Sequence, residues 1–476
     1  MRTTRVLRSG TLATAAAIAA LTTSAGPAGA ATTPTPTLKL GAPSSLALRP
    51  VAADDDSAPQ VRLQLTLTRT GAAAPDRTRL TIDTTQLAGV ADFASLDAGP
   101  SSCTATGRVF TCDVESLPWW GPGGGLGLTV NLTTAKGAPI GTSGSLAVTE
   151  TTADGTSSAA LTRVVIGGTG LKLQPVEGQP DLKVNGTFTR DLRVANQGQL
   201  TAPRLVVVFT ATTGLLFPKY GNCEYGDRIE ADRGPATFHA AVCTVDTALA
   251  PGQSAHLYPV TFTAGRTALA DSMDIQVAPG ESDAVKRIRQ DYRLVRGKGP
   301  LLTVEGGPGH PAPAAGPVTD VNPSDAYVSL DAHTANTADF QAVAHWKADA
   351  TKKAGTLQVG LSNRGPASFN DFRSGGEGET FVDVALPKGV TVTKVPAGCQ
   401  QLVKASNHYS CGTGLWLASG SRHLFDFGLA LDPGTGKVPV PVSLQDQGSY
   451  IEKKPFAVKP FDPNPRDNLT TVTIGS

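Results

Sequence analysis

Six cysteines in three closely spaced pairs constrain the fold of this chain more than any other feature. The pairs are Cys103 and Cys112, Cys223 and Cys243, and Cys399 and Cys411. More than 100 residues separate one pair from the next, so three local disulfides are the simplest of the fifteen pairings that six cysteines allow. A metal site would need closely spaced thiolates with histidine partners, and the seven histidines form no such cluster in the sequence. We therefore expect three disulfides and no metal or other cofactor.

The same spacing, Cys-x8-Gly, follows each cysteine pair and marks three repeats. The glycines are Gly121, Gly252 and Gly420, and a run of alternating apolar residues comes after each of them. Such alternation is typical of a half-buried β-strand. Because glycine adopts a positive φ at little steric cost, we expect each of the three to lie in the turn that enters a long strand.

Each repeat contains about seven short strand candidates separated by turn residues, which is the pattern of an antiparallel two-sheet sandwich. In residues 340–353 a helix and a strand are both compatible with the pattern. We predict an all-β fold of three tandem Ig-like antiparallel β-sandwiches after a cleaved signal peptide. The expected segments are a signal peptide at 1–30, a linker at 31–42, Ig-like domains at 43–168, 169–304 and 324–476, and a Pro/Gly/Ala-rich linker at 305–323.

The first thirty residues have the three parts of a signal peptide. Arg2, Arg5 and Arg8 precede an apolar run at residues 12–21, and Ala28-Gly29-Ala30 provides the cleavage pattern. The run is shorter than the roughly 20 residues that span a membrane, and no later segment is long and apolar enough. We expect a secreted protein, without an integral membrane segment, in a compartment where disulfides persist. A formal charge of +1 offers no basic footprint for nucleic acid.

Two further motifs suggest a family. Asn196-Gln-Gly198 and Asn363-Arg-Gly365 precede the cysteines of the second and third repeats, and Asp462-Pro-Asn-Pro-Arg-Asp-Asn468 precedes the last strand candidate. With the cysteine and glycine spacing, these motifs resemble the conserved-repeat and CARDB-like (cell-adhesion-related) modules of bacterial surface and secreted proteins. The resemblance implies a Gram-positive extracellular protein for spacing, adhesion or presentation. Its partners would be the cell wall, an extracellular glycan or another surface protein, and the family supplies no catalytic residues.

An enzyme remains the contrasting interpretation. The sequence lacks a Gly-x-Ser-x-Gly elbow, a His-Glu-x-x-His motif, a phosphate-binding loop and a dinucleotide fingerprint. A hydrolase site in the third repeat would have to combine His423 and Asp426 with a serine, although a solvent-facing strand explains both residues as well. We predict a non-enzymatic binding, adhesion or spacer protein. A polysaccharide- or wall-binding accessory protein is the alternative, and a hydrolase is less favoured.

Three groups of residues are candidates for ligand binding. Trp119 and Trp120 lie in a turn, where they would either stack on sugar rings or close the end of a sandwich. Arg287, Arg289 and Arg293 belong to a basic run at 286–298, which would either hold anionic wall polymers or form a charged edge strand. Carboxylates at 54–56, 462 and 467 would either bind Ca²⁺ or lie in solvated turns. We favour the structural interpretation for each group.

Overall fold

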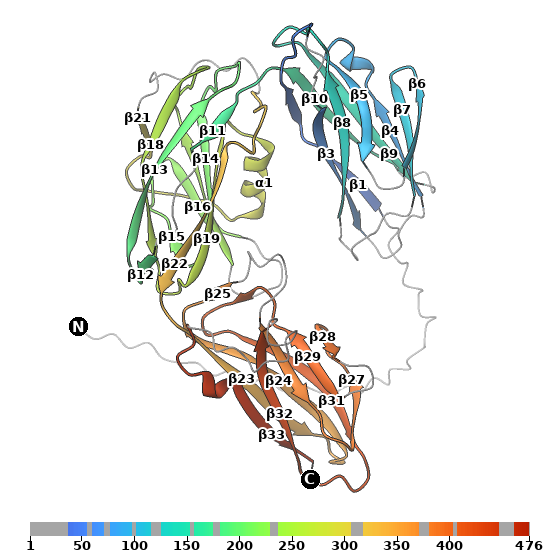
Figure 1. Ribbon diagram of the computed structural model, residues 1–476, viewed down its shortest axis with the longest axis vertical. Coiled ribbons are helices and arrows are strands. Elements are labelled where there is room, and N and C mark those ends of the chain that lie inside the picture. Colours follow the sequence, from blue (N-terminus) through green and yellow to red (C-terminus); the bar gives the residue numbers. More distant parts are fainter. Residues whose placement is uncertain are drawn as a thin grey trace, which may run out of the picture.

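The chain is almost entirely β-structure. The computed structural model describes residues 37–54, 60–70, 77–97, 101–115, 125–152, 157–174, 181–228, 237–305, 318–370, 380–402, 407–446 and 461–475. The strands form three successive pairs of sheets, called the first, second and third sandwich below, which follow one another in an arc (Figure 1). Each pair of sheets encloses its own large hydrophobic cluster. This is the all-β, Ig-like architecture that the alternating pattern predicts.

The first sandwich packs a four-stranded sheet on a six-stranded sheet. In sheet order, the smaller sheet contains β1 (Thr37–Gly41), β3 (Gln60–Thr70), β8 (Gly125–Thr134) and β5 (Ala91–Asp97). The larger contains β2 (Ser45–Leu48), β10 (Ser157–Ile166), β9 (Ser143–Thr152), β4 (Arg77–Asp83), β7 (Val109–Glu115) and β6 (Ser101–Thr106). A short 3-10 helix, η1, spans Thr85–Leu87. All strand pairs are antiparallel except β2 with β10, which are parallel.

The second sandwich has the largest core and the α-helix of the described chain, α1 (Asp283–Asp291). One sheet contains β11 (Leu171–Leu173), β13 (Thr187–Asn196), β18 (Ser254–Ala264) and β15 (Leu215–Leu216), with β21 (Thr303–Glu305) also paired to β18. The other contains β12 (Asp181–Lys183), β22 (Tyr327–Ala335), β19 (Ala270–Ala278), β14 (Leu205–Thr212), β17 (Phe238–Val245), β16 (Cys223–Asp227) and β20 (Val295–Arg296).

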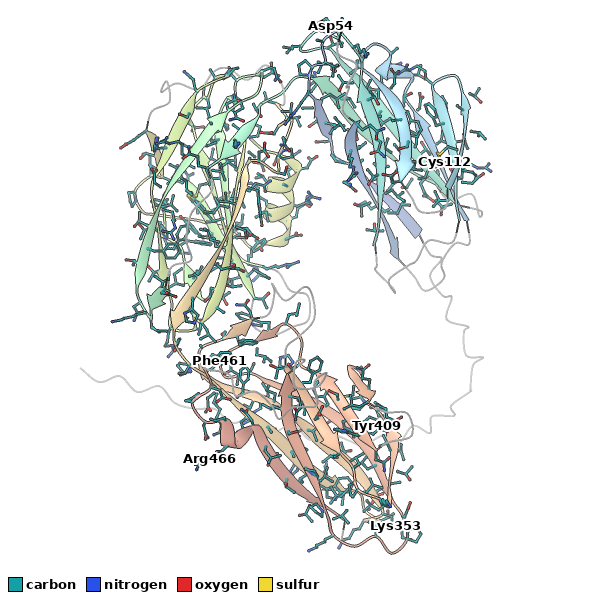
Figure 2. The ribbon with its side chains drawn as sticks, in the orientation of Figure 1. Asp54, Cys112, Lys353, Tyr409, Phe461 and Arg466 are labelled. Atoms are coloured by element: carbon teal, nitrogen blue, oxygen red, sulfur yellow. A yellow bond between two sulfur atoms is a disulfide. The ribbon has the colours of Figure 1, made fainter. Side chains whose placement is uncertain are left out.

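The third sandwich ends in an aromatic cluster on the side that faces the second. Phe461 lies 5.6 Å from Phe340 and 5.0 Å from Phe369 between ring centroids (Figure 2). One sheet contains β23 (Ala338–Ala348), β24 (Ala354–Pro366), β31 (Arg422–Leu431) and β27 (Val390–Lys394). The other contains β28 (Cys399–Gln401), β29 (His408–Gly412), β26 (Thr380–Ala385), β32 (Val438–Asp446) and β33 (Leu469–Ile474). The short elements are β25 (Phe369–Asn370), β30 (Trp416–Leu417) and η2 (Pro465–Asn468). The ambiguous stretch at 340–353 is therefore largely strand.

The same strand order recurs in all three sandwiches. The strands β4, β14 and β26 are central in the larger sheets, between β9, β19 and β32 on one side and β7, β17 and β29 on the other. Beyond the latter follow β6, β16 and β28, and in the smaller sheets β3, β13 and β24 pair with β8, β18 and β31. The repeated spacing in the sequence thus corresponds to a repeated topology.

Helix α1 corrects one prediction. In the basic run at 286–298, residues 286–291 are helix, and only the two residues of β20 are strand. Ser282 caps the helix, because its hydroxyl accepts a hydrogen bond from the backbone N–H of Val285 at 3.3 Å. Val285 and Ile288, one helical turn apart, join a hydrophobic cluster that includes Val206 and Val208 of β14. The helix covers the outer face of β14, so that strand is buried on both sides.

The pairing of β22 bears on the boundary expected at residue 324 between the second and third domains. This strand continues the second sandwich, because it is antiparallel to β19 and parallel to β12. The expected linker at 305–323 also lies between two parts of the second sandwich. Before it β21 pairs with β18, and after it β22 pairs with β19. Within it, Asp320 forms a β-bridge with Thr169. Proline and glycine content alone does not distinguish an insertion within a sandwich from a linker between two.

Candidate functional site

The cysteines form three bridges with one geometry, Cys103–Cys112, Cys223–Cys243 and Cys399–Cys411. In each bridge the two residues face each other on neighbouring antiparallel strands, with Cα atoms 4.0, 3.9 and 4.0 Å apart. The bridged hairpins β6–β7, β16–β17 and β28–β29 lie at or next to a sheet edge. The disulfides therefore fasten outer strands to their sheets, which leaves these edges less open to pairing with another chain.

The repeated glycines belong to a hydrogen-bonded turn. Gly252 and Gly420 have φ angles of 77° and 78°, which favour glycine. Their backbone N–H groups donate to the carbonyl oxygens of Asn196 and Asn363, each at 2.8 Å. Gly121 lies outside the described residues. The Asn-x-Gly motif and the glycine of Cys-x8-Gly are thus joined by a backbone hydrogen bond between two loops that are far apart in the sequence.

The side chains of Asn196 and Asn363 hydrogen-bond to the backbone around them. Both are fully buried, with 0% exposure. The Nδ2 of Asn196 donates to the carbonyl oxygens of Leu200 and Leu249, both at 2.8 Å. The Nδ2 of Asn363 donates to the equivalent carbonyl oxygens of Ala367 and Leu417, both at 2.9 Å. The Oδ1 atoms accept from the N–H two residues on, at 3.0 and 2.8 Å. The motifs behind the family resemblance are therefore structural.

Hydrogen bonds join the first sandwich to the second. The N–H and hydroxyl of Ser44, just before β2, donate to the carboxylate of Asp283 in α1 at 2.6–2.9 Å. The hydroxyls of Ser45 and Thr319 lie 2.7 Å apart. These contacts hold β2 against the helix and against the segment before β22, and we call this region the first joint.

The connecting segment at 167–171 is clamped from two sides. Asp320 accepts from the N–H of Leu171 at 2.8 Å and from the hydroxyl of Thr169 at 3.2 Å, and burial raises the pKa of this carboxyl. On the other side, a Cβ on Gly198 would lie 2.3 Å from the backbone N of Gly170. A glycine is therefore required at 198 for the loop to approach the connection so closely.

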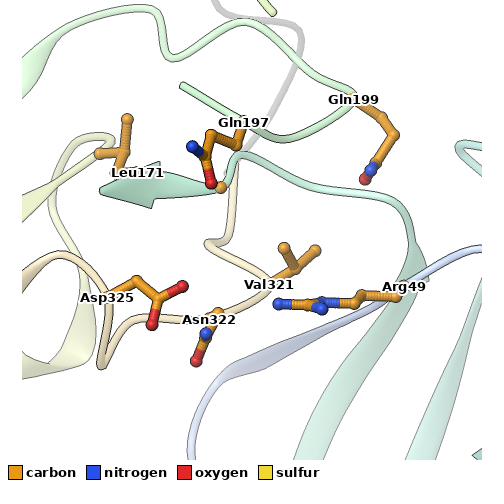
Figure 3. A pocket seen from close by; sticks show the side chains of 8 residues that line it. Arg49, Leu171, Gln197, Gln199, Val321, Asn322 and Asp325 are labelled. Atoms are coloured by element: carbon orange, nitrogen blue, oxygen red, sulfur yellow. The ribbon is translucent and has the colours of Figure 1, made fainter. Parts of the chain in front are cut away.

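A pocket of about 190 Å³ opens at the first joint (Figure 3). Arg49 comes from the first sandwich, and the remaining walls come from the second. Arg49 and Asp325 point toward each other from opposite sides, with Asn322 between them. The lining residues are Arg49, Gly170, Leu171, Gln197, Gln199, Val321, Asn322 and Asp325.

The pocket lining is polar and has no net charge. It combines one guanidinium, one carboxylate and three carboxamides with the aliphatic side chains of Leu171 and Val321. Within the described part of the chain, Arg49 forms no ion pair, and the buried Oε1 of Gln199 accepts no hydrogen bond. The pocket thus presents hydrogen-bonding groups with unused capacity.

A second joint connects the second and third sandwiches. The Nδ2 of Asn336, between β22 and β23, donates to the carbonyls of Arg266 and Ala268 at 2.9 and 2.8 Å. Leu269, although it belongs to a loop of the second sandwich, is 2% exposed and packs in the core of the third. A loop leucine of the second sandwich is therefore inserted into the core of the third.

Asp271 lies beside Leu269 and is 5% exposed. Its carboxylate accepts hydrogen bonds from the hydroxyl of Thr212 and from the N–H of Leu269. Burial raises the pKa of Asp271 to about 6, and these hydrogen bonds offset only part of the effect. The second joint therefore contains a carboxyl group that titrates near neutral pH.

The basic candidates do not form one cluster. Arg289 pairs with Glu281 at 3.0 Å and also with Glu224, so it fastens α1 to β16. Arg287 is exposed on the helix, and Arg293 is exposed beyond its end. Trp119 and Trp120 lie outside the described residues.

The acidic candidates at the end of the chain come together around η2. Asp462 accepts from the Nδ2 of Asn468 at 2.7 Å, and Asp467 accepts from that of Asn464 at 3.0 Å. Burial, with Asp339 and Asp462 nearby, raises the pKa of Asp467. Among the described residues, however, no group of three or more His, Cys, Asp or Glu side chains is arranged to hold a metal. Asp54 is exposed, and residues 55 and 56 lie outside the described part.

The hydrolase candidates do not meet. His423 and Asp426 lie three residues apart on β31 and so point to opposite faces of the sheet. Asp426 accepts from the Nε2 of Gln358 at 2.9 Å on the outer face, whereas burial lowers the pKa of His423. These two residues do not form a catalytic pair.

No protein-family model and no curated protein matches the sequence. Among solved structures, a non-cellulosomal cohesin from Archaeoglobus fulgidus is 13% identical over 27% of this chain and 91% of its own, with a TM-score of 0.19. The C-terminal domain of the Streptococcus agalactiae AgI/II polypeptide BspA is 9% identical over 51% and 96%, with a TM-score of 0.18. The titin domains I67–I69 are 8% identical over 87% and 94%, with a TM-score of 0.17. Similarities this low carry no argument about function.

Proposed function

We propose that this chain is an exported, non-enzymatic extracellular protein in which Ig-like sandwiches form a fixed arm for binding or adhesion. In this proposal the domains span 43–168, 169–335 and 336–476, and 305–323 is an insertion in the second. The protein would be a conserved-repeat or CARDB-like module array of a Gram-positive bacterium. The three disulfides support an oxidising compartment. In the part of the chain that the structure describes, no helix is long and apolar enough to cross a membrane.

The observation that carries this proposal is the construction of the two joints. Hydrogen bonds from Ser44 to Asp283 and from Leu171 to Asp320 fix the first joint, and Leu269 and Asn336 fix the second. Sandwiches on flexible linkers would not need a hydrogen-bonded carboxylate in each connection or a leucine of one sandwich buried in the core of the next. A fixed arm keeps whatever surface it presents at a set distance and orientation.

Small-angle X-ray scattering of the mature protein tests the fixed arm. We expect the measured curve to fit the single arc of Figure 1, because both joints are hydrogen-bonded. Asp320→Ala should broaden the pair-distance distribution, since it releases the connection at 167–171. Asp191→Ala, which removes a carboxylate on β13 that takes part in neither joint, is the control. A wild-type curve that requires an ensemble of unrelated arrangements would contradict the proposal.

A second candidate function is a polysaccharide- or wall-binding accessory protein. The neutral, hydrogen-bonding pocket at the first joint favours it, because such groups match hydroxyl-rich molecules. Co-sedimentation of the mature protein with insoluble cell-wall material tests this role. Wall binding at low and high salt alike supports it, and complete absence from the pellet contradicts it.

A further inference from the structure

We propose that the pocket at the first joint binds one neutral sugar residue of an extracellular glycan. This inference rests on the proposed role in extracellular binding and adds the site and the class of ligand. The pocket volume of about 190 Å³ is equivalent to about six water molecules at ~30 Å³ each. That space suits a single sugar ring and is below the roughly 300–1,000 Å³ of pockets for drug-sized molecules.

The chemistry of the lining selects for a neutral, hydroxyl-rich ligand. An anion would be attracted by Arg49 and repelled by Asp325, and a cation would meet the reverse. An apolar ligand would remove water from five polar side chains without replacing their hydrogen bonds, which is costly. A sugar hydroxyl donates and accepts, so it can serve the guanidinium, the carboxylate and the carboxamides together.

Gln199 gives the most specific indication. Its side chain lines the pocket, and its Oε1 is buried without a donor among the described residues, so a turn of the carboxamide toward the cavity would let this oxygen accept from a ligand hydroxyl. Arg49 brings donors from the opposite sandwich. A sugar bound here would contact both sandwiches and so would add to the contacts that hold them together at the first joint.

Saturation-transfer NMR with the full mature protein tests the site. The probes are glucose, galactose, mannose and N-acetylglucosamine as neutral sugars, glucuronate as an anion and glucosamine as a cation. We expect at least one neutral sugar to bind and the two charged sugars to bind more weakly. Arg49→Ala and Gln199→Leu should each weaken binding about tenfold, or about 1.4 kcal/mol, as expected for a lost hydrogen-bond partner. Arg62→Ala, an exposed arginine on β3, is the matched control and should bind like wild type.

The variant Asp325→Asn separates charge from shape. It gives the lining a net positive charge, so glucuronate should now bind at least as well as the neutral sugar. Thermal unfolding confirms that each variant is folded, and Asn322→Ala replaces any variant that is not. Absence of sugar binding, preference of the wild type for a charged sugar, or binding unaffected by these substitutions would overturn the inference. Because scattering tests the fixed arm separately, sugar binding can fail while the arm stands.

Discussion

In the second and third sandwiches, a glycine with positive φ donates its backbone N–H to the carbonyl oxygen of a buried asparagine. The sequence contains both signals as repeated motifs, Asn-x-Gly and Cys-x8-Gly. Their relation is not local, because more than 50 residues separate Asn196 from Gly252 and Asn363 from Gly420. Spacing could therefore predict a turn at each glycine, but not the hydrogen bond that joins the two motifs.

Replacing Gly420 by alanine tests the strain at this turn. A Cβ there would meet nothing within 4 Å, so the cost is conformational, and we expect a loss of about 1 kcal/mol. Gly436→Ala is the matched control, because it is equally uncrowded but has no positive φ, and it should not destabilise. Hydrogen exchange of β24 and β31 measures both changes. Equal protection in the two variants would show that φ at 420 is not limiting.

Asp271 gives the second joint a dependence on pH. Its pKa is raised from 3.8 to about 6 in the folded protein, so the folded state binds the proton more tightly than the unfolded state. The contribution of Asp271 to the free energy of unfolding should therefore fall by about 2–3 kcal/mol as the pH rises from about 4 to about 6, at 1.36 kcal/mol per pKa unit. It should not change further at higher pH. His239 acts in the opposite direction, because burial lowers its pKa to about 4.

Urea unfolding of the wild type and of Asp271→Asn between pH 4 and 7 isolates this contribution, since His239 is present in both proteins. The difference in unfolding free energy should change across pH 4–6 in favour of the variant. A difference independent of pH would mean that Asp271 has an ordinary pKa.

At the scale of elements, alternation predicted the strands well and failed at α1. Between 286 and 298 the apolar residues fit a period of two by coincidence, while the helical signals, Ser282 and Val285, lie just before that run. The five consecutive apolar residues 205–209 also indicate a strand buried on both faces, which requires a covering element. Reading these two signals together would have favoured the helix.

The capping serine of α1 is a test at this scale. Ser282→Ala should destabilise the helix by about 1 kcal/mol, because the N–H of Val285 loses its acceptor. Ser282→Asp should retain most of the stability, since aspartate caps equally well. Exchange protection of residues 286–291 measures the effect. Equal loss in the two variants would show that the cap is not what holds the helix.

At the scale of the whole molecule, the sequence indicates three repeats but not how they are joined. The pocket at the first joint combines residues 49, 170, 171, 197, 199, 321, 322 and 325, and no local motif spans those distances. A boundary at 324 would separate β22 from its partner β19, about 50 residues earlier, and no local signal in the sequence indicates that pairing. Long-range strand pairing is the information that composition and periodicity lack.

Cleavage within the insertion tests the proposed boundary. A protease site introduced between residues 306 and 317 would leave β22 on the C-terminal fragment but within the sheet of the second sandwich. We therefore expect the two fragments to co-elute in native gel filtration and to separate only in denaturant. Release of a free C-terminal fragment under native conditions would restore the boundary at 324.

The most direct test of the fixed arm is the distance between spin labels on different sandwiches, measured by double electron–electron resonance. Labels at the exposed positions Arg62, Lys183 and Lys388 report on the first, second and third sandwich. A fixed arm predicts one narrow distance distribution for the pair 62–183 and one for 183–388, and Asp320→Ala should broaden only the former. Broad distributions in the unmodified joints, insensitive to Asp320, would contradict the account.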